Sequence, residues 1–215
     1  MKFENTAPDG SSYQKPKPGK YLGVVIGFAY VGTQPAGTYK ATPKVMVRWE
    51  LHKVKGPSLD ESGYIHTSSQ TYGATVRGDK SNFRKVVEAH GIPVPEGGSF
   101  DSHSLLGKCA WLNLEESDDK KYVNVMNVTK LDPEDDTAPT PVTQVFSHWE
   151  PSDEGLCPDW AGWAVGRSLD LAHRAPADKR KDTLDETGKR KQLAGAGVAT
   201  ATAGGDDATG DDIPF

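Results

Sequence analysis

The sequence predicts a mainly β protein with one helix among its strands and a long polar tail. Three observations support this fold class. Apolar and polar residues alternate in runs of strand length, most clearly in KVMVRWELHK at residues 44–53. One strongly helical pattern, at residues 79–91, lies between the third and fourth of these runs. From residue 194 the chain is almost wholly Ala, Gly, Thr and Asp until its last five residues, which buries too little apolar surface to fold.

The chain opens with a polar stretch and a long apolar run. Residues 1–19 are rich in Pro and Gly and end with several lysines, so we expect a flexible arm. The next run, YLGVVIGFAYVG from Tyr21, is β-branched and aromatic, which predicts a buried or strongly bent strand. Gly23 and Gly27 fit positions where the backbone of that strand curves.

The second predicted strand alternates strictly. One side consists of apolar residues that we expect in the core, namely Val45, Val47, Trp49 and Leu51. The other side is expected to face outward and carries Lys44, Met46, Arg48, Glu50 and His52. A third strand, YIHTSSQTYGAT at residues 64–75, is unusually polar.

A helix and a hairpin follow. Asp79 is the expected N-cap of the helix, and Gly91 lies where the helix should end. Phe83, Val86 and Val87 then fall at helical spacing on one face. The runs KCAWLNLEE and KYVNVMNVTKL, separated by a short polar loop, predict a hairpin.

Three strands, a helix and two strands are the element order of the OB-fold. This fold is a small five-stranded barrel with its helix between strands 3 and 4. We therefore predict an OB-fold domain over residues 20–133. A simple β-meander with a packed helix remains the alternative.

Charge and composition change after this domain. Residues 1–133 carry 17 Lys and Arg against 14 Asp and Glu, whereas residues 134–215 carry 8 against 16. Residues 134–174 are interpreted as a C-terminal extension with a short helix in LCPDWAGWAVGRSLDLAHR, where Trp163 lies at the edge of the apolar face. Residues 175–215 are expected to be a disordered linker with an acidic tip.

The tip itself combines charge with an apolar end. Its residues are Asp211, Asp212, Ile213, Pro214 and Phe215. An apolar group at the end of a polar tether suits a partner's pocket, with the carboxylates meeting a basic rim. A polar tail that ends in Phe by chance is the alternative.

Several function classes find no support in the sequence. Cys109 and Cys157 lack the paired spacing of a zinc site and suit reduced thiols in a cytoplasm. We expect no cofactor, no metal and no membrane association, because neither the six histidines nor the carboxylates follow a ligand or catalytic motif and no long apolar run occurs. An enzyme is therefore not expected.

Several segments together resemble one protein family. They are GKYLGVVIGFAYVGTQPAGTYKATPKVMVRWEL, with its Gly-Thr-Gln turn and Arg-Trp-Glu-Leu ending, KSNFRKVVEAHG and LLGKCAWLNL. In this order they resemble bacteriophage single-stranded DNA-binding proteins over roughly residues 19–133. The DDIPF ending resembles the acidic tip of the wider bacterial group, which recruits replication and repair enzymes.

The resemblance implies an OB-fold that binds single strands without reading sequence, in the cytoplasm of a bacterial host. Such binding needs basic groups for phosphates and exposed aromatic rings for bases. We expect the DNA-binding residues to be Tyr30, Tyr39, Lys44, Arg48, Tyr64, His66, Tyr72, Lys80 and Arg84. Alternatively, Tyr30 caps the core and the helix cations are a solvated face. A recombination mediator, a strand-annealing protein and a protein-interaction adaptor remain open as functions, and the oligomeric state is undetermined.

Overall fold

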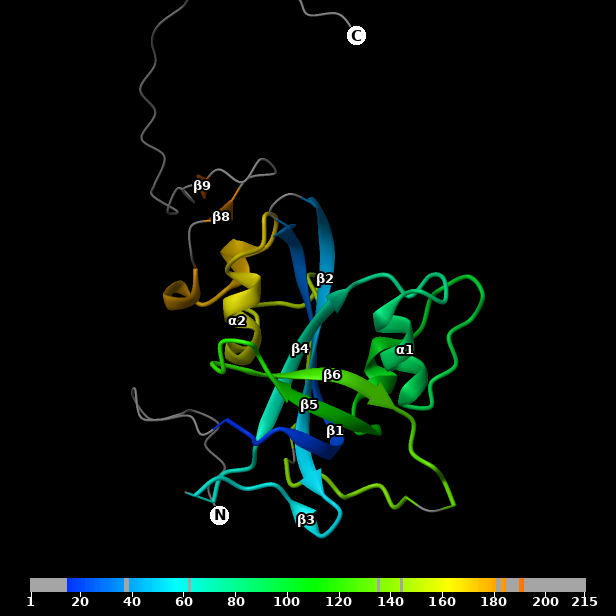
Figure 1. Ribbon diagram of the computed structural model, residues 1–215. Coiled ribbons are helices and arrows are strands. Elements are labelled where there is room, and N and C mark those ends of the chain that lie inside the picture. Colours follow the sequence, from blue (N-terminus) through cyan, green and yellow to red (C-terminus); the bar gives the residue numbers. More distant parts are fainter. Residues whose placement is uncertain are drawn as a thin grey trace, which may run out of the picture.

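One mixed sheet organises the chain (Figure 1). The computed structural model describes residues 15–36, 39–61, 63–134, 136–143, 145–180, 183–184 and 190–191. The sheet has seven strands, all antiparallel except that β7 runs parallel to β1. The strands are β1 (Gly19–Ala36), β2 (Tyr39–Lys53), β3 (Gly56–Pro57), β4 (Thr67–Gly73), β5 (Cys109–Glu116), β6 (Val123–Thr129) and β7 (Ser147–Trp149), and β8 (Thr183–Leu184) pairs separately with β9 (Arg190–Lys191).

Helices are few. The two α-helices are α1 (Asn82–Ala89) and α2 (Asp159–Val165), and the short 3₁₀ helices are η1 (Ser102–Leu105), η2 (Ala172–Arg174) and η3 (Ala177–Lys179). The prediction of a mainly β protein is confirmed, as are the hairpin of β5 with β6 and the helix between the third and fourth long strands.

Strand β1 is shared by three partners. Residues Leu22–Ala36 pair with β2, the first residues, Gly19–Val24, pair with β5, and Gly27–Ala29 pair with β7. A β-bulge between Val25 and Gly27 separates the two edge partners. Such a bulge bends a strand and increases its twist, so one strand can serve two parts of a curved sheet.

The expected five-stranded barrel is not confirmed, because the sheet does not close. The sheet has seven strands, and within the described residues β4 pairs only with β2 and β6 only with β5. The facing edges of β4 and β6 carry no ladder that would close the sheet. The two additional strands, β3 and β7, are short. Strand β3 follows β2 after a tight turn and pairs with its end, and β7 pairs with the middle of β1.

The first core lies between the curved sheet and α1. Trp49, Leu51 and Leu112 are fully buried there, so the prediction that Trp49 is a core residue is confirmed. Helix α1 contributes Phe83 and Val87 from its apolar face. Its N-cap is Ser81, not Asp79 as expected, because the Ser81 hydroxyl accepts a hydrogen bond from the Arg84 backbone N–H at 3.1 Å.

A second core lies on the opposite face of the sheet. Helices α1 and α2 lie on opposite sides of the β1–β2 hairpin (Figure 1). Ala29, Val31 and Met46 pack there against Trp149 of β7 and Ala164 of α2. The interpretation of this side of β2 as solvent-facing is therefore wrong for Met46, which is fully buried.

Helix α2 is shorter than the predicted run of residues 156–174. It ends at Val165, and the chain reverses through a turn at Ser168–Asp170 that is tied to β1. Gly162 and Gly166 allow the later chain to cross closely, because a Cβ at either position would collide with Lys179. The packed structure thus continues beyond residue 174, where Ala175 is buried in the second core.

A buried carboxylate fastens the segment that follows β6. Glu50 is fully buried and accepts hydrogen bonds from the backbone N–H of Val142 at 2.7 Å and of Thr143 at 2.8 Å. His52 Nε2 lies 2.6 Å from the same carboxylate. Burial raises the pKa of Glu50, but hydrogen bonds from His52, Thr143 and Val142 outweigh it and lower the pKa from 4.5 to about 2. Glu50 and His52 were expected on the outward side of β2, but both are buried, and this segment binds the Glu50 carboxylate.

A buried histidine joins α1 to the sheet. The Trp49 indole N–H donates to His90 Nε2 at 3.1 Å, and His90 Nδ1 lies 2.7 Å from the Val86 carbonyl oxygen. A neutral ring with its proton on Nδ1 satisfies both contacts, whereas a second proton on Nε2 would face the indole N–H. Burial lowers the pKa of His90 from 6.5 to about 4, and the hydrogen bond with Val86 opposes this only weakly.

The first prediction concerns stability in mild acid. Between pH 6.5 and 4 the unfolded chain binds a proton at this histidine and the folded chain does not. The free energy of unfolding therefore decreases as the pH is lowered from 6.5 to 4. The His90 contribution amounts to roughly 3 kcal/mol and is lost fully near pH 4. His90→Gln, which can still accept from Trp49, should remove it in urea titrations at several pH values. His173→Gln at an exposed position is the matched control, and equal pH slopes for His90→Gln and the parent would contradict the prediction.

The second prediction concerns Glu50. Glu50→Gln replaces one acceptor oxygen by an N–H group that faces backbone donors, so the free energy of unfolding should fall by about 1–3 kcal/mol. The carboxylate's stabilisation is present above pH 4.5 and is lost as the pH falls toward 2, so the variant and the parent should converge in acid. Glu88→Gln is the control, because it removes an exposed ion pair with Arg84 of similar length, 2.7 Å. An equal effect of both changes would argue against a special role for burial.

Candidate nucleic-acid interface

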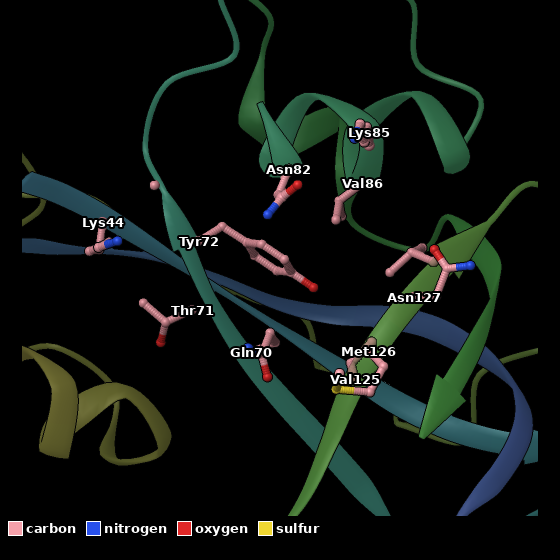
Figure 2. Close-up of a pocket in the computed structure, with 12 residues that line it drawn as sticks. Lys44, Gln70, Thr71, Tyr72, Asn82, Lys85, Val86, Val125, Met126 and Asn127 are labelled. Atoms are coloured by element: carbon pink, nitrogen blue, oxygen red, sulfur yellow. The ribbon is translucent and has the colours of Figure 1, made fainter. Parts of the chain in front are cut away.

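The unpaired edges of β4 and β6 border a cleft of about 410 Å³. Figure 2 shows the ring of Tyr72 extending from β4 toward the gap, with Asn82 and Val86 of α1 above it and Asn127 of β6 beyond it. The lining is mostly polar and includes two lysines. Its residues are Lys44, Gln70, Thr71, Tyr72, Gly73, Asn82, Lys85, Val86, Val125, Met126, Asn127 and Val128.

A second, larger cleft of about 840 Å³ adjoins the first. Its walls come from β4, from the beginning of β6 with its preceding turn, from the start of the described chain and from the α2 segment. The residues that line it are Lys15, Pro16, Thr67, Ser68, Ser69, Gln70, Thr71, Lys121, Tyr122, Val123, Asn124, Trp163 and Arg167. Gln70 and Thr71 line both clefts, so the two form one track along β4.

The charge of this track opposes that of the whole chain, whose net charge is −5. Among the described lining residues five are cationic and none is acidic, the cations being Lys15, Lys44, Lys85, Lys121 and Arg167. Carboxylates approach only from outside the lining, where Glu116 lies 2.8 Å from Lys15 and Asp119 lies 3.6 Å from Lys121. The lining of the track is therefore positively charged, although the chain as a whole is acidic.

Two exposed aromatic rings line the larger cleft. Tyr122 is 66% exposed and Trp163 is 46% exposed. A hydrogen-bonded turn presents Tyr122, since its N–H donates to the Ser117 hydroxyl and its carbonyl accepts from the Ser117 N–H. Lys120 in this turn has a positive φ of 56°, which is uncommon for a residue with a side chain. A base can stack on a ring presented in this way.

The predicted face of the third strand is oriented differently from expectation. Ser68, Gln70 and Tyr72 are paired with Trp49, Val47 and Val45 across the β2–β4 ladder, so they share the side of the first core. The Tyr72 ring packs against Phe83 and Trp49, and its burial raises the pKa of the phenol above its ordinary value of 10. Tyr72 thus lines the smaller cleft only in part.

Tyr64 and His66, also predicted on this strand, precede it. Strand β4 begins at Thr67, and the Tyr64 backbone N–H donates to the Asp60 carboxylate at 2.8 Å. His66 Nδ1 lies 3.1 Å from the Ser58 hydroxyl. Neither belongs to the described lining of the track.

Of the predicted cations, Lys44 lines the track and the other three do not. Arg48 lies 5.9 Å from the centre of the Trp160 ring and donates to the Thr67 hydroxyl, so the second core holds it. Arg84 pairs with Glu88 on the outer face of α1, and Lys80 is exposed before the helix begins. Lys85, the neighbour of Arg84, is the helix cation that lines the track.

The remaining predicted residues lie elsewhere. Tyr30 packs against the first core, which agrees with the alternative interpretation that it caps the core. Tyr39 begins β2, but its side chain lies outside the described part of the structure. The tip residues 211–215 also lie outside the described residues.

Sequence reasoning missed the aromatic and basic groups at the ends of the larger cleft. Tyr122 follows two lysines in the β5–β6 turn, and this basic–aromatic sequence was the available indication. Trp163 was placed only at the edge of a helix face. No local pattern could have brought it next to β4, since residues 67 and 163 are far apart in the chain.

The described residues show no sign of a metal site, a membrane-spanning helix or a disulfide. There, no group of three or more His, Cys, Asp or Glu side chains is arranged to hold a metal ion. The described helices include none that is long and apolar enough to cross a membrane. Both cysteines are unbonded, and burial raises the pKa of the Cys109 thiol to about 12 and that of Cys157 to about 11.

No model of a known protein family matches the sequence, and a search of curated proteins finds no match either.

Proposed function

We propose that this chain binds single-stranded DNA without reading its sequence, during DNA replication, recombination or repair in a phage-infected bacterial cell. One observation carries the proposal. In an acidic chain, two adjoining clefts are lined by five cations and, among the described residues, by no carboxylate, with two exposed aromatic rings alongside. Cations along a groove and rings for base stacking are the two requirements of such binding.

The finer fold assignment is part of this proposal. We assign residues 20–133 to an open variant of the OB-fold. The support is the pairing of β1 with both β2 and β5, the pairing of β2 with β4 and of β5 with β6, and the position of α1 between β4 and β5. In OB-folds the ligand lies by the strand equivalent to β4 and the loop equivalent to the β5–β6 turn. The larger cleft is bounded by both.

Single strands explain the site better than a duplex does. The lining of the track is mixed, with polar groups such as Gln70 and Asn127 beside apolar ones such as Val125. Aromatic rings are useful only where bases are unpaired and their faces are free. The proposed binding mode is phosphates on the lysines and bases against the rings.

The third prediction tests the track. The double variant Lys85→Ala/Lys121→Ala should bind a labelled oligo-dT more weakly than the parent, measured by fluorescence anisotropy. Each lost phosphate contact should reduce the slope of log K against log salt by about 0.7. The matched control is Lys53→Ala, an exposed lysine at the far end of β2 that does not line the track.

Three outcomes separate the candidate functions. If the parent binds oligo-dT and the double variant does not differ from it, the track is not the binding site. Acceleration of strand annealing by the parent would assign it to the annealing class. Absence of binding to single strands, with the tip still capturing a replication enzyme, would identify an adaptor and refute the proposal.

The fourth prediction concerns the tip. Phe215→Ala removes the apolar group and keeps every negative charge of residues 206–215. It should abolish binding to purified host replication or repair enzymes in surface plasmon resonance, because charge alone gives only screened, weak attraction. Thr209→Ala in the same tail is the control. If Phe215→Ala still binds these enzymes, the tip attracts them by charge alone and the proposed role of the Phe215 ring is wrong.

A further inference from the structure

The α2 segment, residues 159–167, supplies one wall of the larger cleft, although it lies outside residues 20–133, which supply most of the lining. Trp163 and Arg167 belong to this segment and line the same cleft as the β5–β6 turn residues Lys121 and Tyr122. Most of α2 is used for packing, since Ala161, Ala164 and Val165 are buried in the second core. Trp163 is not: nearly half of its surface is exposed.

A large exposed aromatic side chain in a cationic cleft calls for a ligand with a flat face. The Arg167 guanidinium lies 5.7 Å from the centre of the Trp163 ring, which places a positive charge beside that ring. An arginine next to an aromatic ring matches a nucleotide, whose base is flat and whose phosphate is negative.

The position of this wall is fixed by contacts to β1. Gln34 Nε2 donates to the Ala164 carbonyl oxygen at 2.9 Å, directly beside Trp163. The Leu169 N–H donates to the Thr33 carbonyl oxygen at 2.9 Å, and Asp170 accepts from the Thr33 N–H at 2.8 Å. The segments before and after Arg167 are thus held against the sheet, so the wall is organised before a ligand arrives.

We infer that Trp163 is a base-stacking residue and Arg167 a phosphate-contacting residue of the single-strand site, so that the C-terminal extension is part of the DNA-binding surface. This inference rests on the proposed function and adds a segment to it. The strand passes between α2 and the β5–β6 turn, and then along β4 toward Lys85. The extension therefore has two roles, covering the second core and completing the cleft.

Tryptophan fluorescence offers a specific test. The chain has five tryptophans, of which Trp49 and Trp149 are buried and Trp163 is exposed in the cleft. Trp111 is a suitable control, because it lies outside the described lining, with Lys20 over its ring at 4.1 Å and Asp136 accepting from its N–H. Affinity is measured separately, by anisotropy of a labelled oligo-dT.

The full-length chain should show fluorescence quenching when oligo-dT binds. Trp163→Phe should remove most of that quenching and keep the affinity within about threefold, since phenylalanine still stacks. Trp163→Ala should weaken binding roughly five- to 150-fold, with little change in melting temperature because the ring is exposed. Trp111→Phe should leave quenching and affinity unchanged. Arg167→Ala should reduce the salt slope by about 0.7, and Arg167→Lys should restore it.

The outcomes separate this inference from the proposed function. If the parent does not bind oligo-dT, the proposed function fails and the inference with it. If the parent binds, but Trp163→Ala keeps the parent's affinity and Trp163→Phe keeps its quenching, the function stands and the inference is overturned. A change in oligomeric mass on Trp163→Ala, with unchanged DNA affinity, also overturns it and assigns the ring to contact between copies.

Discussion

Strand β1 is the element on which the rest of the structure depends, because it must hydrogen-bond to three other strands. It pairs with β2 from Leu22 onward, with β5 before the bulge at Val25 and Gly27, and with β7 after it. Gly27 is needed there, since a Cβ would lie 2.8 Å from the Trp160 ring. A straight, regular strand could not have served both ends of the sheet in this way.

The burial of both faces of the β1–β2 hairpin explains why a C-terminal extension is required. Val45 and Val47 point into one core and Met46 into the other, so without α2 a large apolar surface would be exposed. The same packing brings Trp163 and Arg167 to the edge of β4. A requirement of stability thereby places side chains at the candidate site.

The charged side chains are unevenly distributed over the described structure. The chain is acidic as a whole, yet five cations line the open edge of the sheet. Glu50, in contrast, is buried, and hydrogen bonds from backbone N–H groups and His52 stabilise its ionised form. A net charge of −5 is therefore a poor guide to the ligand. Under the proposed function, the local potential of the cleft attracts the strand, and the cleft lies at the open edge between β4 and β6.

The sequence by itself determined the order of the five long strands and α1, the burial of Trp49 and the β5–β6 hairpin, because these follow from local periodicity and turn residues. It did not determine which side of β2 meets solvent, since Met46 and Glu50 are covered by segments about 100 residues later in the chain. Nor could it assemble the track, which joins Lys85, Tyr122 and Trp163 from three separate segments. The burial of Met46 and Glu50 and the assembly of the track depend on the tertiary structure. Packing between segments distant in the chain, and not local propensity, determines which sheet faces are covered and which strand edges stay unpaired.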